Sequence, residues 1–229
     1  MYQTTAELTA MIDHTNLKAF AEKHEIKQLC EEAVQYGFQS VMVNAVRIPE
    51  CREYLGGSGI IIGTVVSFPL GATSIKAKVQ EATTAMEAGA IEIDYVLDIG
   101  AVKDGNFEQI RSEMRELTEA CHAAGAAVKV IFENCYLTKD EIKAVAAIAG
   151  EIRPDFIKTS TGFGTSGAMI EDVRMMKETA GDMVAVKAAG GIRTLQSFQS
   201  MTEAGAARIG TSNSVAILKE YEALKAGTE

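Results

Sequence analysis

The sequence predicts an α/β protein, a (β/α)8 TIM barrel in which residues 1–229 form a single domain. Short apolar runs alternate with amphipathic helical patterns along the chain, and its 229 residues approach the roughly 250 that such a barrel needs. Apolar residues make up 47% of the chain, and its 3 prolines lie in no Pro- or Ser-rich stretch, which indicates a sizeable core without a linker. An open doubly wound sheet is the alternative, because periodicity does not show whether a sheet closes.

Eight strands are predicted, and a helical pattern follows each of them. Many are apolar throughout rather than alternating, which is typical of strands buried on both faces of a parallel sheet. In chain order the predicted strands are 11–14, 40–44, 60–66, 91–96, 127–132, 156–159, 183–187 and 208–210.

Helix signals stand between the predicted strands. The first ten residues predict a short extra helix, since Thr4 and Glu7 have the spacing of a capping box, and Thr138 and Glu141 repeat that signal later. The segments 21–36 and 107–124 repeat apolar residues three and four apart, which predicts one buried face on each helix. Glycines able to end a helix in the left-handed conformation follow several of these patterns, at Gly37, Gly89, Gly125 and Gly205.

Composition excludes several classes of protein. A net charge of −9 without a Lys/Arg cluster predicts no nucleic-acid partner. No apolar run reaches about 18 residues and the N-terminus lacks a signal-peptide pattern, so we expect no membrane association and a cytoplasmic protein. The 4 cysteines and 3 histidines lack zinc-site spacing, so no metal is expected. Most of the cysteines are typical of small core residues in a reducing compartment: Cys30, Cys51, Cys121 and Cys135.

Two lysines end neighbouring predicted strands. Lys158 lies in Asp-Phe-Ile-Lys-Thr-Ser-Thr-Gly (155–162), and Lys187 lies in Val-Lys-Ala-Ala-Gly-Gly (186–191). The strand ends of a TIM barrel form its active-site mouth, so both amines are expected there. Each ammonium disfavours the charge of the other, and one amine can then be uncharged near neutral pH and attack a carbonyl. The alternative for either lysine alone is a salt bridge at the barrel rim.

Other polar side chains end predicted strands and are candidates for the same mouth. Two compatible roles are open to Asp94, namely structural partner of a lysine and proton transfer. Lys129 lies earlier in its strand and is expected to point inward, and His14 is expected at the mouth or as a hydrogen-bonded core residue. The remaining strand-end candidates are Asp13, Thr15, Asn44, Ser67, Asp98 and Glu133.

Glycine-bearing loops follow three consecutive predicted strands, at 161–164, 190–191 and 210–214. TIM barrels often bind phosphate with the loops after strands seven and eight and with a helix N-terminus. Glycine allows the backbone to approach an anion closely. These loops therefore predict a phosphate site, although most single glycine turns are only turns. Arg193 could add charge, but an arginine in the first turn of a helix is more often solvated.

Taken together, these motifs resemble those of deoxyribose-phosphate aldolases. The resemblance is carried by Phe-Ile-Lys-Thr-Ser-Thr-Gly (156–162), Val-Lys-Ala-Ala-Gly-Gly-Ile-Arg-Thr (186–194) and Gly-Ala-Ile-Glu-Ile-Asp-Tyr-Val (89–96). Supporting matches run in order through nearly the whole chain, at 12–17, 41–44, 129–133 and 208–212.

The resemblance implies a metal-free class I aldolase that needs no cofactor. The implied reaction is the reversible cleavage of 2-deoxy-D-ribose 5-phosphate to D-glyceraldehyde 3-phosphate and acetaldehyde, and the implied role is deoxyribonucleotide catabolism. Lys158 would form the Schiff base, Lys187 would lower the pKa of Lys158, and Asp94 would move protons. The resemblance also implies a homodimer or homotetramer. The implied substrate- and phosphate-binding residues are Gly162, Gly190, Gly191, Gly210 and Ser212, with Thr15 and Asn44 as further strand-end candidates.

Some positions depart from the common pattern of that family, although none is one of the three catalytic candidates. We expect them to affect substrate preference and aldehyde tolerance rather than the class of reaction. With Phe163 after Gly162, phosphate contact at that point would come from the backbone alone. The departures are Met42, Ala45, Asn134, Phe163 and Ala188.

Other functions are less well supported by the residues. A sugar-phosphate isomerase would use a carboxylate base without an imine, and a transaldolase-like lyase would share the imine but transfer a dihydroxyacetone unit. A non-catalytic phosphometabolite-binding protein would bind the sugar phosphate without a covalent adduct. None of these accounts for the lysine pair together with Asp94.

Overall fold

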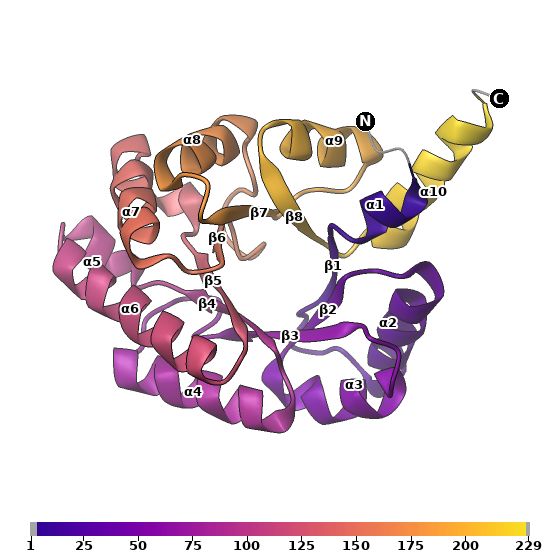
Figure 1. The fold of residues 1–229 in the computed structure, drawn as a ribbon, viewed down its shortest axis with the longest axis horizontal. Helices are drawn as coiled ribbons and strands as arrows, with labels where there is room; N and C mark the ends of the chain where they lie inside the picture. Colours follow the sequence, from indigo (N-terminus) through magenta and orange to yellow (C-terminus); the bar gives the residue numbers. More distant parts are fainter. Residues whose placement is uncertain (1–3, 228–229) are drawn as a thin grey trace.

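The computed structural model describes residues 4–227 and shows a closed barrel of parallel strands in the order β1 to β8. The predicted TIM barrel is confirmed, and the open-sheet alternative is wrong, because β1 pairs with β8 from Ile12 to His14. Helices surround the strands on the outside (Figure 1). The strands are β1 (Ile12–Asn16), β2 (Ser40–Val43), β3 (Ile61–Val66), β4 (Glu92–Val96), β5 (Ala127–Ile131), β6 (Phe156–Lys158), β7 (Ala185–Ala189) and β8 (Ala206–Thr211).

Every predicted strand lies within two residues of the observed one at both ends. The largest displacement is in β7, which was expected at 183–187 and runs from Ala185 to Ala189. Met183 is apolar but exposed, so the apolar run begins before the strand does. Lys187 therefore lies in the middle of β7, and its side chain points into the barrel rather than standing at the rim.

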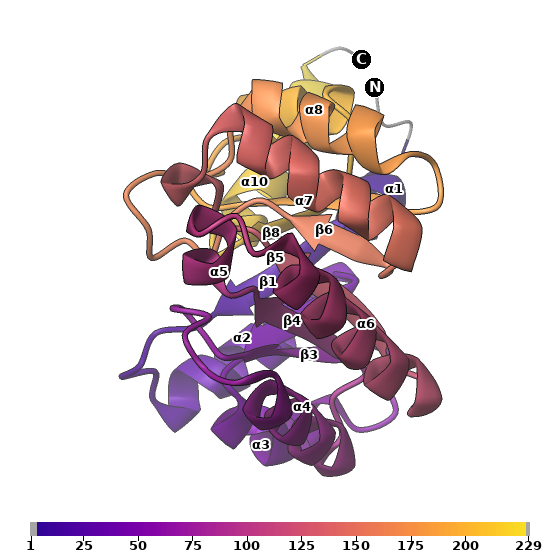
Figure 2. The ribbon, with the colours of Figure 1, turned by 90° about the vertical axis from the view of Figure 1, so that its left-hand side faces the viewer.

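Helices follow the strands around the barrel, with short 3₁₀ turns after β2 and β5. In Figure 2, helices α4, α6, α7 and α8 succeed one another along one side of the molecule. The helical segments are α1 (Thr5–Thr9), α2 (Lys23–Tyr36), η1 (Ala45–Arg47), α3 (Ile48–Leu55), α4 (Ile75–Ala88), α5 (Ile99–Lys103), α6 (Phe107–Ala123), η2 (Asn134–Tyr136), α7 (Lys139–Ile152), α8 (Ile170–Ala180), α9 (Leu195–Glu203) and α10 (Ser214–Ala226).

The predicted helix signals are found at the helix ends. Thr4 accepts a hydrogen bond from the Glu7 amide at 3.2 Å and caps the N-terminus of α1, while positions 1–3 of the predicted N-terminal segment lie outside the described residues. Thr138 and Glu141 form the expected capping box of α7. Gly37 ends α2 in the left-handed conformation, with φ of 67°.

Two apolar regions hold the barrel together. The larger one lies between the strands and the surrounding helices, and it includes the buried faces predicted for α2 and α6. A smaller cluster of Leu17, Met42 and Val65, with Phe68 against it, lies at the ends of β1, β2 and β3. The barrel interior also holds a group of buried charged side chains, and this is where the candidate site lies. Within residues 4–227, no helix is both long enough and apolar enough to cross a bilayer.

Candidate active site

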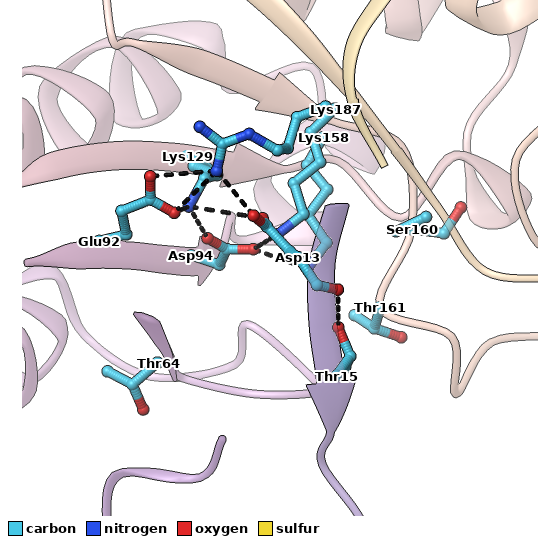
Figure 3. Close-up of polar contacts among 12 residues, drawn as sticks. Asp13, Thr15, Thr64, Glu92, Asp94, Lys129, Lys158, Ser160, Thr161 and Lys187 are labelled. Atoms are coloured by element: carbon cyan, nitrogen blue, oxygen red, sulfur yellow. Dashed lines mark hydrogen bonds and ion pairs between the residues drawn. The ribbon is translucent and has the colours of Figure 1, made fainter. Parts of the chain in front are cut away.

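Charged side chains from six strands meet inside the barrel. Successive side chains of a strand point to opposite faces, so Glu92 and Asp94 of β4, two residues apart, both point inward. Figure 3 shows these carboxylates converging with Asp13 of β1 on lysines of the neighbouring strands. The full group is Asp13, Glu92, Asp94, Lys129, Lys158, Lys187 and Arg208, and all are buried.

Asp94 lies at the centre of this group. Its Oδ2 accepts hydrogen bonds from Lys158 Nζ at 2.8 Å and from Lys187 Nζ at 2.7 Å. Its Oδ1 accepts from Lys129 Nζ at 2.8 Å. The two lysines predicted to share the barrel mouth therefore share one carboxylate oxygen, and Lys129 points inward as expected.

A further set of contacts lies around the same carboxylate. Lys187 Nζ lies 2.5 Å from Asp13 Oδ2, and Lys129 Nζ lies 2.5 Å from Glu92 Oε2. Arg208 bridges these two acids, with one guanidinium nitrogen 2.6 Å from Asp13 Oδ1 and 3.1 Å from Glu92 Oε1. Each buried carboxylate is thus held by at least two cations, which offsets the cost of removing these charges from water.

Burial lowers the pKa of Lys158 from 10.5 to about 8, since a charged amine is disfavoured inside the barrel. Asp94 opposes that effect, and the nearby Lys187 and Lys129 ammonium groups reinforce it. The expected effect of Lys187 is therefore present, but burial is the larger cause. About a tenth of Lys158 is then uncharged at pH 7, far more than for an ordinary lysine, and can act as a nucleophile.

Both aspartates of the group stay ionised. Burial alone would raise the pKa of Asp94, but Lys129, Lys158 and Lys187 outweigh burial and hold that pKa well below its usual value. The pKa of Asp13 is likewise lowered against burial, by Lys187, Lys129 and Arg208. Lys129 has a raised pKa despite burial, because Asp94, Asp13 and Glu92 favour its charge.

A cavity of about 400 Å³ opens above Lys158. Lys158 is the member of the charged group that lines it, so the amine with the lowered pKa is the one that a small molecule can reach. The wall contains six of the predicted binding residues, which are Thr15, Gly162, Gly190, Gly191, Gly210 and Ser212.

Asn44 differs from these, because its amide donates to the carbonyl oxygens of Leu17 at 3.2 Å and Lys18 at 3.5 Å, and it does not line the cavity. His14 combines the two positions expected for it, at the barrel mouth and as a buried, hydrogen-bonded residue. It lines the cavity, while its ring nitrogens lie 2.8 Å from Ser214 Oγ and 2.8 Å from Glu32 Oε2. Arg193 also lines the cavity and is exposed.

The glycine loops come together along one wall of the cavity. Gly190 has a φ of 88° and lies so close to Gly167 that an added Cβ would be 2.9 Å from the Gly167 Cα. A Cβ on Gly210 would lie 3.1 Å from Lys187 Cε. Glycine at these two positions allows the loops to approach one another and leaves room for the lysine beneath.

Glu133 anchors the loop that follows Lys158. Its carboxylate accepts hydrogen bonds from the Thr161 amide at 3.2 Å and from the Thr161 hydroxyl. Thr159 supports the same loop, since its hydroxyl donates to the Ala189 carbonyl at 3.1 Å. Phe163 packs edge-on against Phe68, with ring centroids 5.4 Å apart, and half of its surface remains exposed at the cavity wall.

Sequence reasoning did not identify Glu92 and Arg208 as members of the site. Glu92 had a signal, because it precedes Asp94 by two residues and therefore shares its face of the strand. Arg208 lay within a quoted motif, but its contacts with Asp13 and Glu92 depend on closure of the barrel between β8 and β1. The part of the chain described here holds no group of three or more His, Cys, Asp or Glu side chains arranged around a metal position.

Comparison with known proteins gives a consistent result. A model described as DeoC/LacD family aldolase matches residues 8–220. A deoxyribose-phosphate aldolase of Aciduliprofundum boonei is 51% identical over 216 residues, which cover 94% of this chain and 97% of that protein. One of Lactobacillus acidophilus is 51% identical over 225 residues, which cover 98% of this chain and 94% of that protein.

The fold comparison agrees. The tetrameric deoxyribose phosphate aldolase of Aeropyrum pernix superposes on this structure with a TM-score of 0.88 and 28% sequence identity. The match covers 97% of this chain and 94% of the Aeropyrum pernix chain.

Proposed function

Because the chain belongs to the DeoC/LacD aldolase family, we propose that it is a class I deoxyribose-phosphate aldolase, a lyase that works through a lysine Schiff base. The substrate is 2-deoxy-D-ribose 5-phosphate, and the products are D-glyceraldehyde 3-phosphate and acetaldehyde. The observation that carries this proposal is the buried Lys158 amine, which faces the cavity with a lowered pKa and bonds to Asp94 at 2.8 Å.

The covalent step begins with the uncharged amine of Lys158. Its nitrogen attacks the aldehyde carbon of the open-chain sugar, and loss of water leaves a protonated imine. Removal of the proton from the C3 hydroxyl then breaks the bond between C2 and C3. The electron pair of that bond moves into the imine, which leaves a neutral enamine and the aldehyde of glyceraldehyde 3-phosphate.

Asp94 and Lys187 are the proposed proton carriers. Lys187 Nζ donates a hydrogen bond to Asp94 Oδ2 at 2.7 Å, and the same oxygen accepts from the reacting amine of Lys158. A proton taken from the C3 hydroxyl is returned to C2 of the enamine, directly or through one water molecule. Hydrolysis of the resulting imine releases acetaldehyde and restores Lys158.

Phosphate is proposed to bind at the glycine wall, to Gly162, Gly190, Gly191, Gly210 and Ser212. Backbone amides in these loops are suited to an anion, and Ser212 stands just before α10, whose N-terminus carries a partial positive charge. Thr15 is proposed to contact the sugar from the end of β1, which pairs with β8 beside that wall. Asn44 is proposed to act indirectly, by holding the segment at Leu17 and Lys18 that borders the cavity.

An isomerase is disfavoured because it would act through a carboxylate base without an imine. It would therefore leave the buried Lys158 amine at the cavity, with its lowered pKa, without a role. A non-catalytic binding protein would leave the lowered pKa of Lys158 without a role.

Further features belong to the same proposal. We propose that residues 1–229 form one domain, that the protein is cytoplasmic, and that it acts in deoxyribonucleotide catabolism without a metal or cofactor. A homodimer or homotetramer is proposed because the similar Aeropyrum pernix enzyme is tetrameric. Light scattering coupled to gel filtration measures this directly, and a monomer at micromolar concentration would contradict it.

The reaction is tested by incubating the protein with 2-deoxyribose 5-phosphate and measuring acetaldehyde and glyceraldehyde 3-phosphate separately. We expect equal amounts of both products, and their loss in Lys158→Ala. Lys143→Ala, on the exposed surface of α7, is the matched control and should keep the activity. Isomerised sugar without cleavage, or cleavage that persists in Lys158→Ala, would contradict the proposal.

A further inference from the structure

The charges inside the barrel extend beyond the residues proposed to act on the substrate. Arg208 and Glu92 do not line the cavity, and Glu92 stands two residues before Asp94, toward the N-terminal ends of the strands. The Arg208 guanidinium carbon lies 5.2 Å from the centre of the Phe156 ring, and Lys129 Nζ lies 5.8 Å from the same ring. Arg208, Glu92 and Lys129 thus form a buried ionic floor, which Phe156 covers.

This floor connects to Lys158 by two short routes. The first route starts where Glu92 bonds Lys129, and the second starts where Arg208 bonds Asp13. Lys129 then bonds Asp94, and Asp13 contacts Lys187, which bonds Asp94 as well. Asp94 finally bonds Lys158. A change of charge in the floor therefore acts on Lys158 through a region with little water to screen it.

Counting these charges shows an imbalance. Four cations (Lys129, Lys158, Lys187 and Arg208) face three anions (Asp13, Glu92 and Asp94), so the fully ionised group carries one excess positive charge. The inward-facing residues of β2 and β3 that adjoin this group are Ser40, Met42, Gly63 and Val65, and none of these is ionisable. Because buried charge is costly unless paired, the group is balanced when one lysine is neutral.

We propose that Arg208 and Glu92 are positioning residues that set the pH at which Lys158 becomes a free amine, by fixing the charge balance of the barrel interior. Lys158 is the amine that gives up its proton because it contacts one carboxylate, that of Asp94, whereas Lys187 and Lys129 each contact at least two. The raised pKa of Arg208, where Asp13 and Glu92 outweigh burial, agrees with a permanent cation in the floor.

The proposal predicts opposite effects for two substitutions of similar size. Glu92→Gln removes an anion, so the Lys158 ammonium is less stable and titrates at a lower pH. Arg208→Gln removes a cation, so the ammonium is more stable and titrates at a higher pH. Both shifts are expected to be about half a pH unit, which is less than a directly contacting charge produces. The double variant restores the balance and should titrate close to the wild-type protein.

The titration is measured without substrate, by brief labelling with acetic anhydride between pH 6 and 10 and quantification of the acetylated Lys158 peptide. The surface pair Arg111→Gln and Glu151→Gln makes the same charge changes outside the barrel and should leave the Lys158 titration unchanged. If Arg208→Gln does not fold, Glu92→Gln and Asp13→Asn are compared, and both should lower the pH of half-labelling.

Shifts in the same direction for Glu92→Gln and Arg208→Gln, or no shift in either, would overturn the inference. A purely structural role would reduce stability in both single variants and further in the double variant, without restoring the titration. The inference rests on the proposed function only through the choice of Lys158 as nucleophile. A protein that shows the opposite shifts but does not cleave the sugar phosphate would contradict the proposed function and leave the charge balance intact.

Discussion

Asp94 is the side chain that organises the cluster, because both of its oxygens are occupied by lysine amines. One oxygen holds the amine proposed to react and the amine proposed to pass protons, within 2.8 Å and 2.7 Å respectively. The same contacts stabilise the charged form of Lys158, so Asp94 opposes the effect of burial on that amine. Asp94 thus holds the two lysine amines in a fixed geometry and reduces the fraction of Lys158 that is uncharged.

Replacing Asp94 by asparagine should separate these two effects. We expect Asp94→Asn to lower kcat by about 10²–10⁴-fold, the usual contribution of a general acid–base group. Imine formation on Lys158 should persist, since loss of the carboxylate favours the free amine. Steady-state kinetics and borohydride trapping measure the two effects.

Asp98→Asn is the matched control for Asp94→Asn. Asp98 follows the same strand and caps α5 by accepting from the Ala101 amide, a role that asparagine can also fill. Turnover at the wild-type rate in Asp94→Asn would rule out the proposed proton transfer.

The lowered pKa of Lys158 also predicts a pH dependence. The ammonium is the unreactive form, so kcat/KM should rise with pH, pass its half-maximal value near pH 8 and level off above it. The phosphate ester of the substrate loses its second proton near pH 6, so this ionisation does not account for a rise in kcat/KM around pH 8. A rate measured from pH 6 to 10 that is independent of pH would contradict a lysine with this pKa as the nucleophile.

At the scale of elements, the loop between β6 and α8 joins the nucleophile to the proposed phosphate site. It begins directly after Lys158 and contains Gly162 and Phe163. Its position depends on Glu133, which follows β5 with a φ of 55° and holds Thr161 by the amide and the hydroxyl. Backbone strain at a non-glycine residue is tolerated here because the side chain is fixed by these contacts.

Removing that anchor should weaken phosphate binding more than chemistry. In Glu133→Ala we expect KM for 2-deoxyribose 5-phosphate to rise about tenfold, the equivalent of roughly 1.4 kcal/mol. The kcat/KM for unphosphorylated 2-deoxyribose should change little, because that substrate makes no contact through a phosphate. Glu133→Gln keeps one acceptor for Thr161, so its KM for 2-deoxyribose 5-phosphate should fall between those of the wild-type protein and Glu133→Ala. Equal losses with both sugars would place Glu133 in the chemistry instead.

Across the whole molecule, closure of the barrel decides which site residues meet. Strand ends and the two-residue period were sufficient to bring Lys158, Lys187 and Asp94 together, because these signals are local to each strand. Arg208 was not identified, since its partners come from β1 and β4 and depend on closure and register. Asn44 directly follows β2, but its side chain turns to the carbonyl groups of Leu17 and Lys18, which depends on packing between loops.

The cysteines can report whether residues 1–229 unfold as one domain. Cys30 of α2 and Cys51 of α3 are buried side by side, Cys121 is buried in α6 at another place around the barrel, and Cys135 is partly exposed. With brief thiol alkylation across a urea gradient, we expect the three buried cysteines to react at the same midpoint, as a cooperative unit requires. Cys135 should react at lower urea and is the internal control. Separate midpoints for Cys30 and Cys121 would indicate independent units.

The central claim is that Lys158 forms a covalent imine with the sugar phosphate. The most direct measurement is reduction with sodium borohydride in the presence of 2-deoxyribose 5-phosphate, followed by intact mass and peptide mapping. We predict a single reduced adduct on Lys158 that disappears in Lys158→Ala and remains in Lys143→Ala. A folded protein that binds the sugar phosphate and yields no adduct, or an adduct on another lysine, would contradict the account.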